Sequence, residues 1–164
     1  MAEVESVAEH SFGVAAISLI LSEKLMETGV EIDVSRTLKM AILHDLSESL
    51  TFDISKRYLE FLGKHGLRIK RQIEHSANRK LLLQFPHLLK SDASSLLKEH
   101  ETGRTIEAQI VTAADRIDLL MQLDAYHRRG YRGKILMEMK EKVKNEIKEM
   151  KNPVFSSTLN SIIE

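Results

Sequence analysis

Apolar residues recur every three or four positions along most of this chain, which is the spacing of one face of an α-helix. The segment Ser6–Glu9 has the form of a helix-capping box, and Gly29 provides a stop, so we predict a first helix over residues 7–28. Its apolar line consists of Val7, Val14, Ile17, Leu21 and Leu25. His10 falls on the same line, so this imidazole is expected to face the interior.

A second helix should begin after Asp33 as N-cap and should carry Leu38, Ala41 and Ile42 inward. It reaches His44 and Asp45 in its last turns, and residues 49–55 are expected to form a loop. Helices are also predicted over residues 67–85, 89–100, 104–128 and 134–151, with breaks at Pro86 and Gly103. The fifth helix carries the apolar residues Ile106, Ile110, Val111, Ala114, Ile117, Leu120 and Met121. Asp115 lies among them.

The composition fits one globular, all-α domain of about six or seven helices. The chain has 164 residues, 43% of them hydrophobic, and a formal net charge of zero. A balanced charge argues against a nucleic-acid scaffold or a membrane-surface protein, because both usually carry a strong positive excess. The chain has no cysteine, which excludes disulfides and thiolate metal sites. The longest apolar stretch is too short to span a bilayer, and the acidic N-terminus lacks the features of a signal peptide, so a soluble, cytoplasmic protein is expected.

Three helices each place a metal-ligand residue type on or near an inward face. These residues are His10 on the first helix, His44 and Asp45 on the second, and Asp115 on the fifth. A lone histidine on an apolar face is more often a hydrogen-bonded core residue, but that explanation is weak for all four together. Two imidazoles and two carboxylates suit hard and borderline divalent ions, and the open coordination positions would take water and substrate.

The order His10, then His44-Asp45, then Asp115 resembles the signature of the HD-domain metal-dependent phosphohydrolases. The blocks around these residues, with Glu48 and Asp53 following the second, resemble most closely the branch of 5'-deoxynucleotidases. The resemblance implies a single HD domain over residues 1–164. Its metal-site core would lie within residues 6–128, with peripheral C-terminal helices in 131–164. It also implies one divalent cation (Mn, Co, Ni, Fe, Zn or Mg), a homodimer, and hydrolysis of nucleoside 5'-monophosphates to nucleoside and phosphate.

Two further carboxylates are candidate catalytic groups. Glu48 lies about one helical turn beyond Asp45, where it could hydrogen-bond a metal-bound water or a ligating imidazole as a general base. Its alternative is a solvated residue at a helix end. Asp53 is, by resemblance, the second catalytic acid, although the sequence alone slightly favours a helix N-cap. Thr51 is a further candidate for substrate contact.

In the resembled branch, a segment before the first ligand carries an Arg that holds the phosphate and a Trp beside the sugar. Nine residues precede His10 here and the chain contains no Trp, so either the natural chain extends upstream of Met1 or another group holds the phosphate. Lys56 and Arg57 are the nearest candidates for such a phosphate clamp. Arg71 and Arg79 are expected on the wet face of a long helix, and His100 is expected on the surface.

Two other functions remain open on the sequence. One is an HD phosphohydrolase that acts on nucleoside triphosphates or cyclic nucleotides, because the metal constellation is shared across the superfamily. The other is a metal-stabilised module that binds nucleotides without turnover. Glu48 and Asp53 argue against this module, since a purely structural metal site would not need them.

Overall fold

In a computed structural model of the chain, the structure describes residues 5–52, 54, 59 and 61–150. These residues contain seven α-helices, one 3₁₀ helix and no strand. The elements are α1 (Val7–Met26), α2 (Val34–Leu43), α3 (Glu48–Thr51), η1 (Gly63–His65), α5 (Gly66–Leu82), α6 (His87–Thr102), α7 (Ile106–Arg128) and α8 (Lys134–Lys148). The predicted all-α fold is confirmed.

Local signals in the sequence set the helix boundaries. The Ser6 side chain accepts a hydrogen bond from the Glu9 backbone, and the Glu9 side chain returns to the Ser6 backbone, which completes the predicted capping box of α1. Asp33 caps α2 through the Arg36 backbone amide. Gly29 follows the end of α1 with a φ of 87°, a left-handed conformation that favours glycine.

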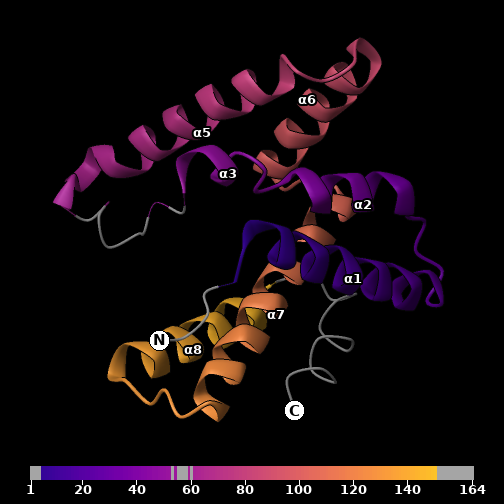
Figure 1. Ribbon diagram of the computed structural model, residues 1–164. Coiled ribbons are helices and arrows are strands. Elements are labelled where there is room, and N and C mark those ends of the chain that lie inside the picture. Colours follow the sequence, from indigo (N-terminus) through magenta and orange to yellow (C-terminus); the bar gives the residue numbers. More distant parts are fainter. Residues whose placement is uncertain (1–4, 53, 55–58, 60, 151–164) are drawn as a thin grey trace.

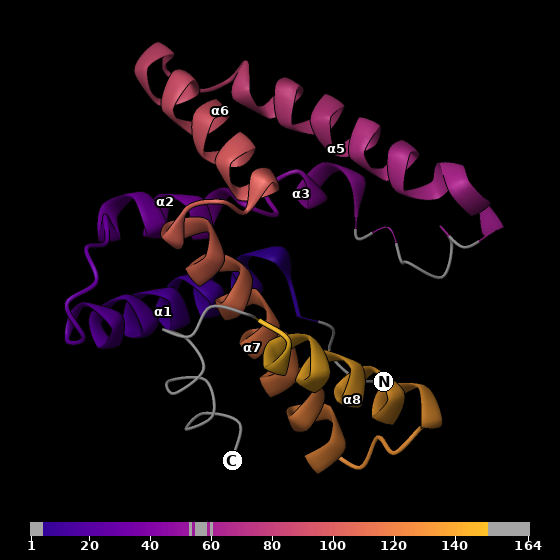
Figure 2. The ribbon, with the colours of Figure 1, turned by 180° about the vertical axis from the view of Figure 1, so that it is seen from behind.

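One long helix, α7, crosses the molecule and links its parts. It packs against α1 and α2 on one side and against α8 further along, while α5 and α6 form a hairpin in which α6 packs against α2 and α7 (Figures 1 and 2). The α6 helix connects this hairpin to α2 through two ion pairs, Arg36 with Glu99 and Lys39 with Asp92. The beginning of α1, the end of α2 and the middle of α7 lie together in one region.

A continuous apolar core lies between α1, α2, α6, α7 and α8. Its fully buried members include Val14, Leu21, Leu25, Met40, Ala41, Leu96, Ile110, Val111, Ala114 and Ile147. These are mainly the residues that the helical spacing placed inward. No helix in the described part of the chain is both long and apolar enough to cross a membrane.

Three sequence-based expectations about these elements are wrong. Residues 49–51 were expected to belong to a loop but are helical, because α3 covers Glu48–Thr51. Ile42 and Met121 were expected inside but are 55% and 58% exposed. In α2 the buried residues are Thr37, Met40, Ala41 and Leu43, so the face that packs is turned away from Ile42.

Candidate metal centre

His10 extends from the first turn of α1 and contacts three carboxylates. Its Nδ1 atom donates to Oδ2 of Asp118 at 2.8 Å, because a carboxylate can only accept. Its Nε2 atom lies 3.5 Å from Oδ2 of Asp45 and 3.4 Å from Oδ1 of Asp115. The hydrogen bond to Asp118 therefore fixes the ring with Nε2 directed at the other two carboxylates, as outer hydrogen bonds do for metal-binding histidines.

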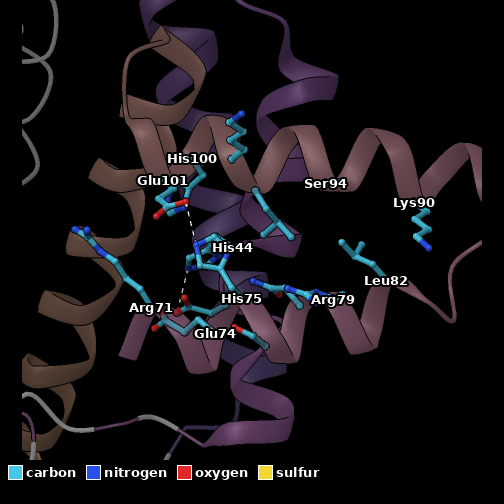
Figure 3. A pocket seen from close by; sticks show the side chains of 15 residues that line it. His44, Arg71, Glu74, His75, Arg79, Leu82, Lys90, Ser94, His100 and Glu101 are labelled. Atoms are coloured by element: carbon cyan, nitrogen blue, oxygen red, sulfur yellow. Dashed lines mark ion pairs between the residues drawn. The ribbon is translucent and has the colours of Figure 1, made fainter. Parts of the chain in front are cut away.

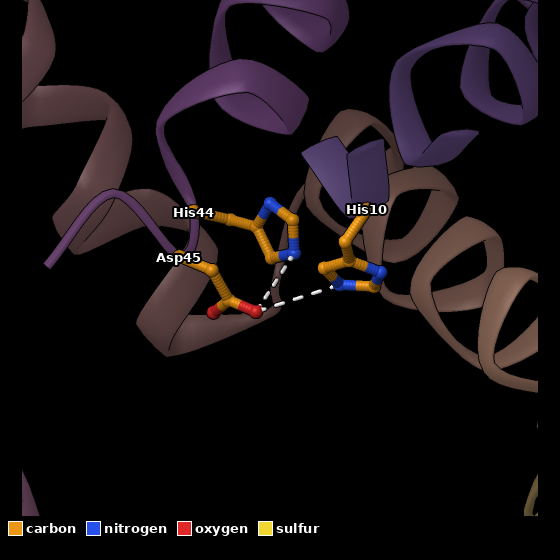
Figure 4. Close-up of side chains that lie close together, drawn as sticks. All are labelled: His10, His44 and Asp45. Carbon is orange, nitrogen blue, oxygen red and sulfur yellow. Dashed lines mark ion pairs between the residues drawn. The ribbon is translucent and has the colours of Figure 1, made fainter. Parts of the chain in front are cut away.

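His44 and Asp45 follow directly after the last turn of α2. The Nδ1 atom of His44 donates to the backbone carbonyl of Ala41 at 2.7 Å, which leaves Nε2 as the atom with the free lone pair. Nε2 is buried, has no hydrogen-bond partner among the residues that the structure describes, and lies 3.3 Å from Oδ2 of Asp45. Asp45 thus points the same oxygen at both imidazoles (Figure 4). A buried nitrogen without a partner is costly in a purely structural cluster.

The third element of the site is α7, which supplies Asp115 and, one turn later, Asp118. Oδ1 of Asp115 faces His10, while its Oδ2 accepts from Nη1 of Arg116 at 2.9 Å. Nε of Arg116 in turn lies 2.9 Å from Oε2 of Glu146 on α8. This chain of contacts holds the Asp115 carboxylate from the side opposite His10.

Close approach of α1 to α7 depends on Gly13. A Cβ atom at this position would lie 2.1 Å from Oδ1 of Asp118, so no larger residue fits without moving that carboxylate. Gly13 is three residues beyond His10 and therefore on nearly the same face of α1. The missing side chain lets Asp118 reach the His10 ring.

These contacts shape the charge of the cluster. Asp115, Asp118 and Asp45 together raise the pKa of His10 to about 12 in the absence of an ion. Burial alone would raise the pKa of Asp45, but its contacts with His10 and His44 outweigh burial and hold this pKa well below its usual range. Burial likewise opposes ionisation of Asp115, yet His10 and Arg116 lower its pKa. Both carboxylates are therefore anionic at neutral pH.

The residues present fit a divalent cation. Donor atoms of His10, His44 and Asp45 all lie within 4.8 Å of one another, and Asp115 faces the same His10 nitrogen. Two imidazole nitrogens with two carboxylates form a donor set suited to Mn, Fe, Co, Ni or Zn. A cation there would also give the unpartnered Nε2 of His44 its missing contact. The structure thus brings together all four predicted metal ligands.

Asp118 and His100 are the residues of this region that sequence reasoning missed. Asp118 could have been found, since it lies one helical turn after Asp115 and shares its face. His100 was expected on the surface, but its Nε2 atom is buried with no hydrogen-bond partner among the described residues, and its ring lies 5.6 Å from that of His44. His100 approaches His44 from α6, and no local pattern in the sequence predicts this contact.

The predicted catalytic and substrate residues are only partly placed by the structure. Glu48 is the half-buried first residue of α3, and its amide donates to the carbonyl of Asp45 at 2.9 Å. The Thr51 hydroxyl lies 3.2 Å from the carbonyl of Ser47, so it contacts the backbone of its own helix. Phe52 then adopts a φ of 57°, which turns the chain sharply after α3. Asp53, Lys56 and Arg57 lie outside the described residues.

A cavity of about 680 Å³ adjoins the cluster, and both His44 and Asp45 line it. The remaining lining residues come mostly from α5 and α6. The space is larger than a hydrated ion requires, so a small molecule can lie next to the candidate metal ligands.

Comparison with known proteins identifies the family of this chain. The HD domain family model matches residues 1–154. A 5'-deoxynucleotidase of Dictyostelium discoideum is 29% identical over 77% of this chain and 65% of its own length, and one of Vibrio vulnificus is 33% identical over 69% of this chain and 58% of its own. The chain thus spans about three-fifths of the length of these relatives.

Two solved structures extend the similarity to nearly the whole fold. A conserved hypothetical protein of Pyrococcus furiosus aligns with a TM-score of 0.76 and 33% identity, over 97% of this chain and 81% of its own. A protein of Pyrococcus horikoshii aligns with a TM-score of 0.76 and 34% identity, over 98% and 84% respectively. Together with the family match across the helices that carry His10, His44, Asp45 and Asp115, these findings show that the chain belongs to the HD domain family.

Proposed function

We propose that this protein is a divalent-metal-dependent phosphomonoester hydrolase that converts nucleoside 5'-monophosphates and water to nucleosides and phosphate. The observation that carries the proposal is the convergence of His10, His44, Asp45 and Asp115 around the unpartnered Nε2 of His44. The relatives named as 5'-deoxynucleotidases support the substrate class.

In this proposal the four ligands hold one cation, and the surrounding residues orient them. Asp118 keeps Nδ1 of His10 protonated and Ala41 does the same for His44, so both Nε2 lone pairs face inward. When bound, a divalent cation supplies Lewis acidity toward a phosphoryl oxygen and makes water more acidic. The metal's identity is left to experiment.

The reaction breaks the bond between phosphorus and the 5' oxygen and forms one between phosphorus and the water oxygen. Glu48 would accept the proton of the attacking water as general base, and Asp53 would deliver a proton to the departing 5' oxygen. Thr51, Lys56 and Arg57 are the proposed substrate contacts near this point. Such a division of roles needs little beyond positioning and charge neutralisation, which is typical of phosphoryl transfer.

The proposal also covers the organisation of the protein. We take residues 1–164 as a single HD domain, with the metal-site core within 6–128 and peripheral helices in 131–164. Its expected partner besides the nucleotide is a second copy of the chain, as a homodimer in the cytoplasm.

The test measures metal content and phosphate release from a panel of ribo- and deoxynucleoside monophosphates. Asp45→Asn should lose both the metal and the activity. Glu48→Gln should keep the metal but lose about 10²–10⁴-fold in kcat, the range for a general base. Glu23→Gln, at an exposed position of α1, serves as the control.

An Asp45→Asn variant that kept both metal and activity would show that the site is assigned wrongly. A wild-type protein that bound metal but released no phosphate from any nucleotide would favour the non-catalytic module instead.

A further inference from the structure

The cavity next to the candidate metal ligands is a groove between α5 and α6. Figure 3 shows side chains from both helices projecting into it, with His44 at its inner wall. The His100 ring lies 5.6 Å from that of His44, whereas Lys90 lies toward the opposite end of the groove. Lys90 is ten residues from His100 on α6, which corresponds to roughly 15 Å along the helix axis.

The face of α5 that borders this groove is polar. Arg71, His75 and Arg79 are spaced four residues apart, and Glu74 and Asn78 repeat that spacing one residue earlier. A helix face that turns toward a neighbouring helix is normally apolar, because burial of apolar surface stabilises the pair. Arg71 and Arg79 are exposed, as expected for the wet face of the helix, and the structure adds that this face borders the groove.

Four cationic side chains line the groove without an ion-pair partner among the residues that the structure describes. They are Arg71, Arg79, Lys90 and Lys98. Unpaired cations around a concave surface raise the local concentration of anions. The groove is therefore suited to a negatively charged ligand.

The acidic residues at the groove edge do not cancel this charge, because Glu74 is already paired with Lys70 and Glu101 is a single negative charge beside four cations. Glu74 lies 3.3 Å from Nζ of Lys70, and Glu101 lies 3.5 Å from Nε2 of His75. Asp45 also lines the groove, but it is one of the four candidate metal ligands. An excess of positive charge remains along α5 and α6.

Two buried polar atoms of residues that line the groove also have no hydrogen-bond partner in the described part of the chain. These are Oδ1 of Asn78 on α5 and Nε2 of His100 on α6. A buried amide oxygen or imidazole nitrogen normally forms a hydrogen bond, so each marks a place where a polar ligand or water would be stabilised. The polar atoms of a nucleoside are suitable partners for both groups.

A single phosphate group cannot satisfy all four cations. Arg71 and Arg79 are eight residues apart on α5, as are Lys90 and Lys98 on α6, so each pair spans roughly 12 Å along its helix. A phosphomonoester carries about −1.5 to −2 charges at neutral pH. Because a divalent cation is already balanced by Asp45 and Asp115, one such group leaves about half of the groove's positive charge uncompensated.

We propose that this groove binds a second phosphate group, on the 3' side of the nucleoside whose 5'-phosphate is hydrolysed. The inference rests on the proposed 5'-nucleotidase function and specifies its substrate class. The scissile phosphate lies at the metal ligands, the nucleoside lies along Asn78 and His100, and the second phosphate contacts Arg79 and Lys90. That second phosphate belongs either to a nucleoside 3',5'-bisphosphate or to the first internucleotide linkage of a 5'-phosphorylated dinucleotide.

The experiment compares three probes on the metal-loaded protein at fixed ionic strength. These are deoxyadenosine 5'-monophosphate, deoxyadenosine 3',5'-bisphosphate and the 5'-phosphorylated deoxyadenosine dinucleotide. Phosphate release gives kcat and KM, and calorimetry gives Kd under conditions without turnover. We expect one of the probes with a second phosphate to bind and react with KM and Kd at least about tenfold lower than the monophosphate, since charge-assisted hydrogen bonds are at least that strong. The favoured probe identifies the source of the second phosphate.

The variant Arg79→Gln/Lys90→Gln should bring the three probes to within about twofold of one another in KM and Kd. Lys80→Gln is the matched control, because Lys80 is exposed on the same helix and does not line the groove. Helix content by circular dichroism and metal content confirm that the variants are folded.

The outcomes separate this inference from the proposed function. Equal KM and Kd for all three probes, or a preference that persists in the double variant, overturns the inference even if the monophosphate is hydrolysed. If a probe with a second phosphate binds more tightly than the monophosphate, and the difference in Kd disappears in the double variant, the groove binds the second phosphate. That conclusion holds even if no probe is hydrolysed and the hydrolase proposal fails.

Discussion

Replacement of Gly13 by alanine tests whether Asp118 positions His10. The new Cβ would lie 2.1 Å from Oδ1 of Asp118, so the carboxylate must rotate away and its 2.8 Å hydrogen bond to Nδ1 of His10 is lost. A hydrogen bond to a charged group contributes about 1.5–3 kcal/mol, while alanine stabilises a helix interior by about 0.5–1 kcal/mol relative to glycine. The expected net loss in the free energy of unfolding is therefore about 1–2 kcal/mol.

The same substitution should weaken metal binding, since the His10 ring loses the contact that orients it. Loss of such an outer hydrogen bond typically costs about 10–100-fold in metal affinity. Urea unfolding of the chelated protein measures the stability term, and titration with Mn²⁺ or Zn²⁺ measures the affinity. Chelation during unfolding prevents metal binding from contributing to the apparent stability.

A double-mutant cycle with Asp118→Ala decides whether the reasoning is correct. In that background the carboxylate is gone, so Gly13→Ala should no longer destabilise and should instead stabilise α1 by about 0.5–1 kcal/mol. The sign of the effect therefore reverses between the two backgrounds. If Gly13→Ala costs the same in both, Asp118 is not the group that it displaces.

Three further predictions concern the surroundings of the site. Removal of divalent metal by a chelator should lower Tm, because a ligand at 100 times its Kd stabilises the folded state by about 2.7 kcal/mol. If Tm did not rise on re-addition of Mn, Fe, Co, Ni or Zn, the result would contradict a metal site. Arg116→Met should lower metal affinity about tenfold by releasing the Asp115 carboxylate, whereas Glu146→Gln should have a smaller effect, and metal titration ranks the two. Arg36 lowers the pKa of Glu99 below its ordinary value of 4.5. The ionised Glu99 carboxylate therefore stabilises the folded state fully above pH 4.5, and this stabilisation is lost as the pH falls through the lower pKa of the folded state. Acid unfolding of Glu99→Gln should accordingly show a shallower pH dependence below about pH 4.5 than the wild type, and identical slopes would rule out this contribution.

Helix boundaries were predictable because the interactions that set them are local. The Ser6–Glu9 capping box and the Asp33 cap each join residues three positions apart, so the sequence displays both partners together. The inward direction of His10 followed from Val14 and Leu21 on the same face, both of which are fully buried. Helical periodicity predicts only a broad face, however, and that is why Ile42 was placed inside.

The residues that sequence reasoning missed are defined by contacts between distant segments. Asp118 matters because it meets His10, 108 positions earlier in the chain, and Gly13 matters because it makes room for that contact. His100 matters because α6 packs on α2 and brings its ring to His44. Arg71 and Arg79 are exposed, as predicted, but amphipathic spacing could not show that this exposed face also borders a groove.

The arrangement of the cluster favours a metal site over a structural ion-pair network. In a network that stabilises the fold, each buried donor and acceptor has a partner, because an incomplete polar network is less stable than an apolar core. Here three carboxylates surround the imidazole of His10. The buried Nε2 of His44, in contrast, has no hydrogen-bond partner among the described residues and lies near only one carboxylate, that of Asp45. A divalent cation between His10 and His44 would neutralise Asp45 and Asp115 and bind that nitrogen at the same time. The cluster therefore gains most from a ligand with two positive charges, which is the reason that metal removal should affect the stability of the whole α1–α2–α7 junction.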